Sequence, residues 1–223
     1  MADHADRDRR EQASLVPLLL AMTVVTGIVD AVSILRLGHV FVANMTGNVA
    51  FLGFAVAGAS GFSVVASLVA LGAFLAGAAI NARSVRGTSH QALGRTAAVE
   101  AGLCAAATIV AIASSGTTPR YAMTVVLALA MGGQNATARK LAIPDMTTTV
   151  LTLTLTGLAA DRNDIGQPAS HTRRRAGAVA AMLAGAISGA LLVLHGSAGW
   201  ALGTATAILA AVAVTARRHA DPS

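Results

Sequence analysis

Charged and aromatic side chains are both scarce in this sequence. Only 12% of the 223 residues are charged and 3% are aromatic, whereas 55% are hydrophobic. Soluble domains carry about 25% charged residues, so this composition excludes an ordinary soluble protein. The hydrophobic residues form blocks of about 17 to 22, the length that a helix needs to cross roughly 30 Å of hydrocarbon. We therefore expect an all-α, polytopic membrane protein whose main partner is the lipid bilayer.

Other absences limit the chemistry of the chain. Cys104 is the single cysteine, which excludes an intramolecular disulfide and a cysteine metal cluster. No two of the six histidines have metal-site spacing on a helix, and no nucleophile elbow of the form G-x-S-x-G occurs. We expect no enzyme activity, no metal and no cofactor. The net charge of +6 comes from Lys and Arg that lie between the hydrophobic blocks as topology signals, so we expect no nucleic-acid partner.

Six hydrophobic blocks are long enough to span a membrane, and two are shorter and more polar. The long blocks are 15–35, 62–82, 97–113, 121–138, 176–194 and 200–216, and the short ones are 44–59 and 146–160. If all eight crossed, ten of the 16 Lys and Arg would face the cytoplasm. If each short segment enters and leaves on the same side, fourteen of the 16 Lys and Arg face the cytoplasm. Because Lys and Arg concentrate in cytoplasmic loops, we predict six full spans plus two re-entrant segments.

This topology divides one membrane domain, residues 1–223, into two halves. A cytoplasmic tail, 1–14, leads into a first block that is too long for a cleaved signal peptide. The first repeat is 15–113, the second is 121–216, and a second cytoplasmic tail is 217–223. Each half has three full spans, and because three is odd the second half must run in the opposite orientation.

The two halves also match each other in residues. The segments 27–31 (GIVDA), 45–49 (MTGNV) and 73–78 (AFLAGA) match 132–136 (GGQNA), 146–150 (MTTTV) and 185–190 (GAISGA) in the same order. We therefore predict a 3+3 inverted repeat, an architecture of many transporters, whose sites lie near the midplane where broken helices meet. Small residues at helical spacing indicate close helix packing. They are Gly72, Ala73, Gly77, Gly185 and Gly189.

The same residues resemble a known family. The runs Gly27-x-x-Asp30-Ala31, Ala43-Asn44-Met45-Thr46-Gly47-Asn48 and Met131-Gly-x-Gln134-Asn135-Ala136, with Thr147-Thr148, closely resemble the YoaK-like family of uncharacterised bacterial membrane proteins. The likeness extends over residues 15–218, with extra threonines at 149, 152 and 154. The resemblance implies a multi-pass protein of the bacterial cytoplasmic (inner) membrane and implies no established substrate.

Eight polar residues are candidates for a solute or ion path. Asp30 lies within the first span and is either a coupling group or a structural carboxylate that caps the first short helix or pairs with Arg36. The short segments begin with polar residues that either present helix N-termini to a solute or only cap and pack the turns. Amides in the fourth span either line the path or join helices. The candidates are Asp30, Asn44, Thr46, Asn48, Gln134, Asn135, Thr147 and Thr148.

Two functions follow from this pattern. The first is a small transporter or channel for a small polar or anionic solute. A homo-oligomer suits it, because six spans are few for one transporter. The alternative is a membrane-embedded structural or partner-binding protein in which the polar residues only hold helices together. Glu100 is expected to pair with Arg95 near the cytoplasmic surface.

Overall fold

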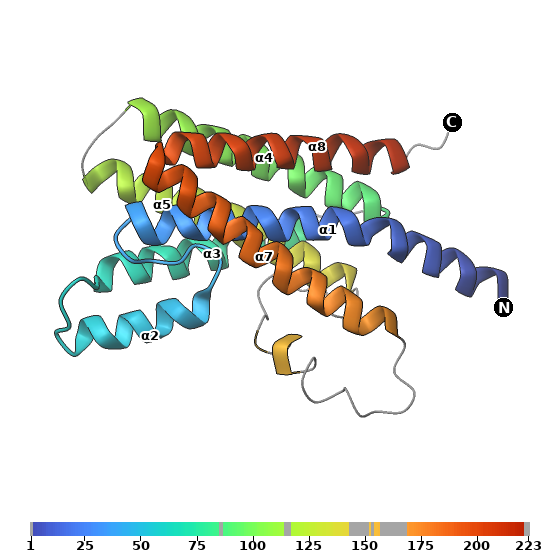
Figure 1. The fold of residues 1–223 in the computed structure, drawn as a ribbon, viewed down its shortest axis with the longest axis horizontal. Coiled ribbons are helices and arrows are strands. Elements are labelled where there is room, and N and C mark those ends of the chain that lie inside the picture. The colour runs from blue at the N-terminus through green and yellow to red at the C-terminus, as the bar shows by residue number, and fades with distance from the viewer. Residues whose placement is uncertain are drawn as a thin grey trace.

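The computed structural model describes residues 2–84, 87–113, 117–142, 152, 154–156 and 169–220. Within these residues no strand occurs, and seven helices make up the bundle. Their bounds are α1 Ala2–Arg36, α2 Met45–Val56, α3 Val64–Ser84, α4 Ser89–Ala113, α5 Thr117–Leu141, α7 Ala169–His195 and α8 Ala198–Ala220 (Figure 1). The all-α prediction is therefore confirmed.

Five of these helices are long and apolar enough to cross a membrane. They are Glu11–Arg36 of α1, α3, α4, Thr172–His195 of α7, and α8. The remaining predicted span, 121–138, lies within α5, which has 25 residues and so has the necessary length. It is not one of the five. Gln134 and Asn135 in its second half lower its hydropathy, and both have structural partners described below.

The helix α2 is too short to cross a bilayer. Its 12 residues extend about 18 Å at 1.5 Å per residue, against roughly 30 Å of hydrocarbon. Positive φ angles at Gly38 and His39 turn the chain back after α1. After this turn, α2 lies beside α3, and its last residues are at the end of the bundle where α1 also ends (Figure 1). The other predicted short segment, 146–160, lies outside the described residues except for positions 152 and 154–156.

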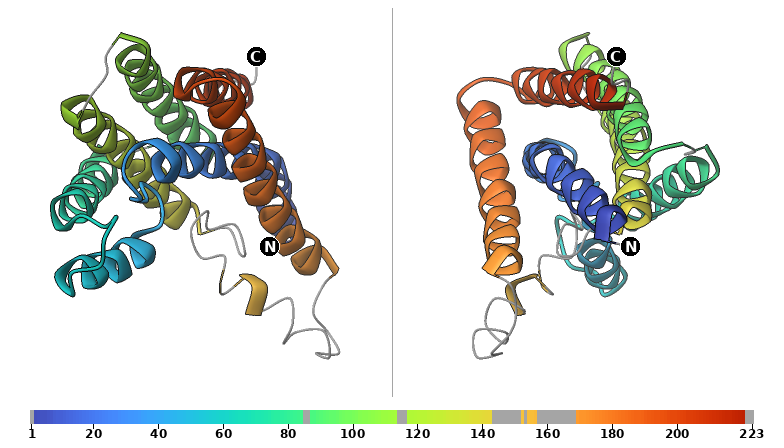
Figure 2. Two further views of the ribbon diagram at one scale, coloured as in Figure 1. Left: turned by 60° about the vertical axis from the view of Figure 1, so that its left-hand side comes forward. Right: turned by 90° about the vertical axis from the view of Figure 1, so that its right-hand side faces the viewer.

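The long helices pack in pairs. Helix α1 lies along α7, α3 lies along α5, and α4 lies along α8; α1 also contacts α8, and α5 also contacts α4 (Figure 2). Of the spanning segment in α1, 67% is buried, compared with 22% in α3 and in α7. Helix α1 is therefore the centre of the bundle, and the outer helices turn large apolar side chains such as Leu75 and Ile187 outward.

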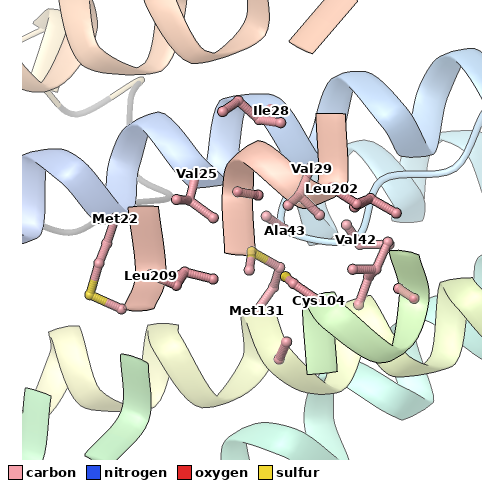
Figure 3. Close-up of a cluster of buried hydrophobic side chains, with 14 of the residues drawn as sticks. Met22, Val25, Ile28, Val29, Val42, Ala43, Cys104, Met131, Leu202 and Leu209 are labelled. Atoms are coloured by element: carbon pink, nitrogen blue, oxygen red, sulfur yellow. The ribbon is translucent and has the colours of Figure 1, made fainter. Parts of the chain in front are cut away.

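The core gathers around α1. Its side chains meet apolar residues of the segment before α2 and of helices α4, α5 and α8 (Figure 3). The labelled members of this cluster are Met22, Val25, Ile28, Val29, Val42, Ala43, Cys104, Met131, Leu202 and Leu209. Cys104 is buried in this cluster and has the packing role of a small apolar residue.

Glycines bring α1 and α7 into backbone contact. A Cβ at Gly27 would collide with the backbone of Met182 and Ala186, and a Cβ at Gly185 would collide with the backbone of Val24. A Cβ at Gly189 would lie 2.7 Å from the Cα of Ile28. The prediction of close packing at Gly185 and Gly189 is confirmed, because no side chain larger than hydrogen fits at either position.

The pair α3 and α5 meets in the same way. A Cβ at Gly132 would collide with the backbone of Phe74 and Ala78, and one at Gly77 would collide with the backbone of Leu129. Gly72 differs, because a Cβ there would meet nothing within 4 Å. The packing role predicted for Gly72 is therefore wrong: this residue lies on a face of α3 that none of the described helices covers.

Substituting these two glycines separates packing from helix propensity. We expect Gly132→Ala to lower stability by about 1–3 kcal/mol, because the added methyl group forces α3 and α5 apart. Gly72→Ala adds the same methyl group in open space and is expected to leave stability unchanged or raise it slightly. Thermal unfolding of the purified protein, followed by size-exclusion chromatography, measures both. Equal melting temperatures for the two variants would contradict the α3–α5 contact.

Candidate functional site

The carboxylate of Asp30 holds the chain that doubles back after α1. Its Oδ1 accepts hydrogen bonds from the backbone N–H of Val42, at 3.2 Å, and of Ala43, at 3.0 Å. Asp30 lies six residues before the end of α1, which is about 9 Å along the helix. Residues 42 and 43 therefore lie beside the body of α1, well before its end, and one carboxylate oxygen is the acceptor for two backbone N–H groups of this segment.

Arg36 contacts α7 and does not pair with Asp30, the partner suggested for it by the sequence. Its Nη2 donates to the carbonyl oxygen of Val193 near the end of α7, at 3.0 Å. A cation in this position satisfies one of the last carbonyls of a helix and interacts favourably with the helix dipole. The Asp30–Arg36 pairing is therefore wrong, and the structural role of Asp30 is to anchor the segment that leads into α2.

Asp30 also lines a cavity. The cavity has a volume of about 440 Å³ and lies between α1, residues 41–44 and α7. Among the described residues no donor reaches Oδ2 of Asp30, and the carboxylate is part of the cavity wall. The volume falls in the range of small-molecule sites, about 300–1,000 Å³. Its lining residues are Thr26, Gly27, Asp30, Ala31, Ile34, Leu35, Phe41, Ala43, Asn44, Met182, Ala186 and Ala190. We call this space the outer cavity.

The polar residues at the start of α2 have mainly structural contacts. Asn44 is the N-cap of α2, because its Oδ1 accepts from the N–H of Gly47 at 3.2 Å. Asn48 is fully buried and bonds to both backbone groups of Phe41, accepting from its N–H at 2.8 Å and donating to its carbonyl at 2.6 Å. Of the predicted residues in this segment, only Asn44 borders the outer cavity. Thr46 is exposed and does not line it.

Gln134 links two other helices. Its amide lies 2.5 Å from Oε1 of Glu100 on α4 and 2.8 Å from Oγ1 of Thr26 on α1. Glu100 is 1% exposed, whereas Arg95 is exposed, so the expected pairing of these two residues is replaced by the contact with Gln134. Sequence analysis missed Thr26, which borders the outer cavity one turn before Asp30. Its only signal is a hydroxyl on the same face of the span.

A second polar junction joins α3, α4 and α5. Nδ2 of Asn81 lies 2.6 Å from the carbonyl oxygen of Gly133 and 2.6 Å from Oγ1 of Thr137. The hydroxyls of Thr96 and Thr137 lie 2.7 Å apart. Hydrogen bonds between membrane helices contribute about 0.6–2 kcal/mol each. This junction was not predicted, because its residues come from three different helices and only the packing brings them together.

Of the last predicted site residues, the structure describes only Asn135, which does not line the outer cavity. Nδ2 of Asn135 donates to the carbonyl of Met131 within α5, at 2.9 Å. Thr147 and Thr148 lie outside the described residues. The structure therefore brings Asp30 and Asn44 together, connects Gln134 to them through Thr26, and leaves Thr46 and Asn48 outside the cavity wall.

Comparison with known proteins gives the family. The family described as "Protein of unknown function (DUF1275)" matches residues 18–215. The chain belongs to this family. It is similar to the "UPF0700 transmembrane protein YoaK" of Bacillus subtilis (strain 168), with 35% identity over 148 residues, which is 65% of this chain and 65% of that protein. No solved structure matches the chain at a significant level. The resemblance to YoaK-like membrane proteins is confirmed.

Two substitutions at Asp30 test its anchoring role. Asp30→Asn keeps an acceptor oxygen for Val42 and Ala43, so we expect a folded protein with modest loss of stability. Asp30→Ala leaves two backbone donors unpaired at membrane depth, which costs about 1–3 kcal/mol for each. The melting temperature of the purified protein measures the difference, with Asn44→Ala as a control that loses one cap of about 1 kcal/mol. Asn and Ala variants of equal stability would show that Asp30 does not hold this segment.

Proposed function

We propose that this chain is a small membrane transporter or channel for a small polar solute, which binds in the outer cavity against Asp30. The observation that carries the proposal is a carboxylate at membrane depth that borders a cavity of about 440 Å³. A charged side chain at that depth costs about 2.5–3.5 kcal/mol on insertion scales, and such residues are typical of solute and ion pathways. Asp30 is also the coupling group of this proposal, for a proton or a cation.

A second cavity supports a pathway with two ends. It has a volume of about 330 Å³ and lies between α3 and α5. Its lining residues are Asn81, Ala82, Ala136, Arg139 and Lys140. Arg139 and Lys140 belong to the last turn of α5. The other end of α5, at Thr117, is the end that follows α4. We call this space the inner cavity.

The contacts of four glycines support the inverted repeat. Gly27 meets Met182 and Ala186 on α7, and Gly132 meets Phe74 and Ala78 on α3 at corresponding positions. In the same way Gly185 meets Val24, and Gly77 meets Leu129. These contacts make Gly77 equivalent to Gly185, whereas the sequence match of the two halves paired Gly77 with Gly189. The sequence match of this segment was therefore shifted by one helical turn. The pairing of α1 with α7 and of α5 with α3 follows the same symmetry.

The same equivalence relates the two cavities. Ala31 and Ala190 of the outer cavity correspond to Ala136 and Ala82 of the inner cavity. An inverted repeat places such equivalent sites at opposite sides of a membrane, and alternating access opens them in turn. The proposal therefore includes six full spans with α5 as the sixth, re-entrant segments in both halves, and both termini in the cytoplasm of a bacterial inner membrane.

The contacts of Asp30 favour a neutral polar or cationic solute over an anionic one. Its carboxylate already accepts from the N–H groups of Val42 and Ala43, just before α2, and Asn44 accepts from the N–H of Gly47 in the first turn. These donors are therefore not available to an anion. The negative charge and the remaining oxygen of Asp30 instead suit a solute that donates hydrogen bonds.

One observation favours the alternative of a structural or partner-binding protein, for example a homo-oligomer. In the described part of the chain, every buried side-chain nitrogen or oxygen has a hydrogen-bond partner. Polar residues that only hold helices together would show the same pattern. The two functions differ in whether water and solute reach the cavities.

Cysteine accessibility distinguishes a transporter or channel from a structural protein. In a Cys104→Ser background, we expect Ala31→Cys to react with a membrane-impermeant thiol reagent in intact cells, and Ala136→Cys to react only after permeabilisation. The matched pair tests equivalent positions of the two cavities. If neither position reacts from either side, both cavities are closed to water and the structural function gains support.

Transport is measured by charge movement in proteoliposomes on a solid-supported membrane. We expect at least one member of a panel of small amines, polyols and amides to give a transient current. Asp30→Asn should remove this current while the protein remains folded, because the coupling charge is lost and the backbone contacts are kept. Currents of the same size in wild type and Asp30→Asn would exclude Asp30 as the coupling group.

A further inference from the structure

Glu100 is a buried acid, and no described basic residue forms an ion pair with it. It lies at the middle of α4 and is 1% exposed. Its carboxyl group contacts the amide of Gln134, and the buried thiol of Cys104 lies one turn further along α4. A buried carboxylate without a cation is strongly disfavoured. The surroundings therefore favour a neutral carboxyl group, which is a hydrogen-bond donor.

The distances between Glu100 on α4, Gln134 on α5 and Thr26 on α1 fit a carboxyl group that donates a hydrogen bond. Oε1 of Glu100 lies 2.5 Å from one amide atom of Gln134, whose other amide atom lies 2.8 Å from Oγ1 of Thr26. Oγ1 of Thr26 in turn lies 3.0 Å from the carbonyl oxygen of Met22. A separation of 2.5 Å lies at the short end of the range for O–H···O, about 2.5–3.0 Å, and below the range for N–H···O, about 2.7–3.2 Å. The separation therefore favours the amide oxygen of Gln134 as the atom that faces Glu100.

With Glu100 protonated, Glu100, Gln134 and Thr26 form a hydrogen-bonded series in which each group donates to the next. The carboxyl O–H donates to Oε1 of Gln134, Nε2 of Gln134 donates to Oγ1 of Thr26, and the hydroxyl of Thr26 donates to Met22. With Glu100 ionised, the amide must turn over so that Nε2 faces the carboxylate. Nε2 then faces both carboxylate oxygens of Glu100, at 2.5 and 3.3 Å, and Oε1 of Gln134 accepts from the hydroxyl of Thr26, which gives up its bond to the carbonyl of Met22.

We propose that Glu100 is a proton-binding site, and that its proton sets the orientation of the Gln134 amide and of the Thr26 hydroxyl at the wall of the outer cavity. When Glu100 loses its proton to water, the carboxylate accepts from Nε2 of Gln134, and Thr26 changes its hydrogen bond. Proton binding at Glu100 does not depend on transport. Its link to a solute rests on the proposed function, because Thr26 borders the cavity in which that solute binds.

Infrared spectroscopy of the purified protein in lipid nanodiscs tests the proton site without any solute. The C=O stretch of a protonated carboxyl group is separate from the bands of carboxylates. We expect a protonated-carboxyl band at neutral pH that Glu100→Gln removes and that the matched control Asp30→Asn leaves in place. Gln134→Leu should shift the frequency of this band, because the acceptor of the Glu100 proton is gone.

Each variant has an outcome that overturns part of the proposal. A spectrum of Glu100→Gln identical to that of the wild type would show that Glu100 is ionised, and the proposal fails. An unshifted band in Gln134→Leu would show that the proton is not donated to Gln134. Glu100→Gln keeps the size of the side chain, and thermal unfolding checks that it folds. A lost band together with absent transport currents would leave the proton site established and refute only the transporter.

Discussion

The structure depends on the hydrogen bonds between Asp30 and the backbone of Val42 and Ala43. A chain that leaves a helix inside a membrane exposes N–H and C=O groups for which lipid offers no partner. Here the chain doubles back after Arg36, and a carboxylate and the amide of Asn48 supply the missing partners. Because residues 42–43 are held beside α1, α2 begins level with the body of α1, packs on α3, and leaves room for the outer cavity.

The outer cavity is a consequence of how α1 is surrounded. Backbone contact at Gly27 and Gly185 brings α7 close to α1, and the returning segment fills only part of the space above that contact. The remaining wall is mostly apolar, with Asp30, Thr26 and Asn44 as its polar groups. Such a wall binds a solute through few directed contacts, which is the usual composition of a small-molecule site.

The sequence predicted those features that composition and charge alone determine. Hydropathy located the helices, and the excess of Lys and Arg on one side pointed to a short segment at 44–59, where the structure has α2. It did not predict that Asn48 bonds to Phe41, which depends on how the chain turns before α2, or that Gln134 reaches Glu100, which lies on another helix. Gly72 and Gly77 also look alike in the sequence, and only the packing of α3 on α5 distinguishes them.

The most direct test of this account is the side of the membrane on which α2 ends. Ser60, which is exposed between α2 and α3, and Thr88, which is exposed before α4, suit single cysteines in a Cys104→Ser background. If Asp30 turns the chain back so that α2 enters and leaves on one side, Ser60→Cys reacts with an impermeant reagent in intact cells. Thr88→Cys then reacts only after permeabilisation. Protection of Ser60→Cys until permeabilisation would mean that the 44–59 segment crosses the membrane, which contradicts the account.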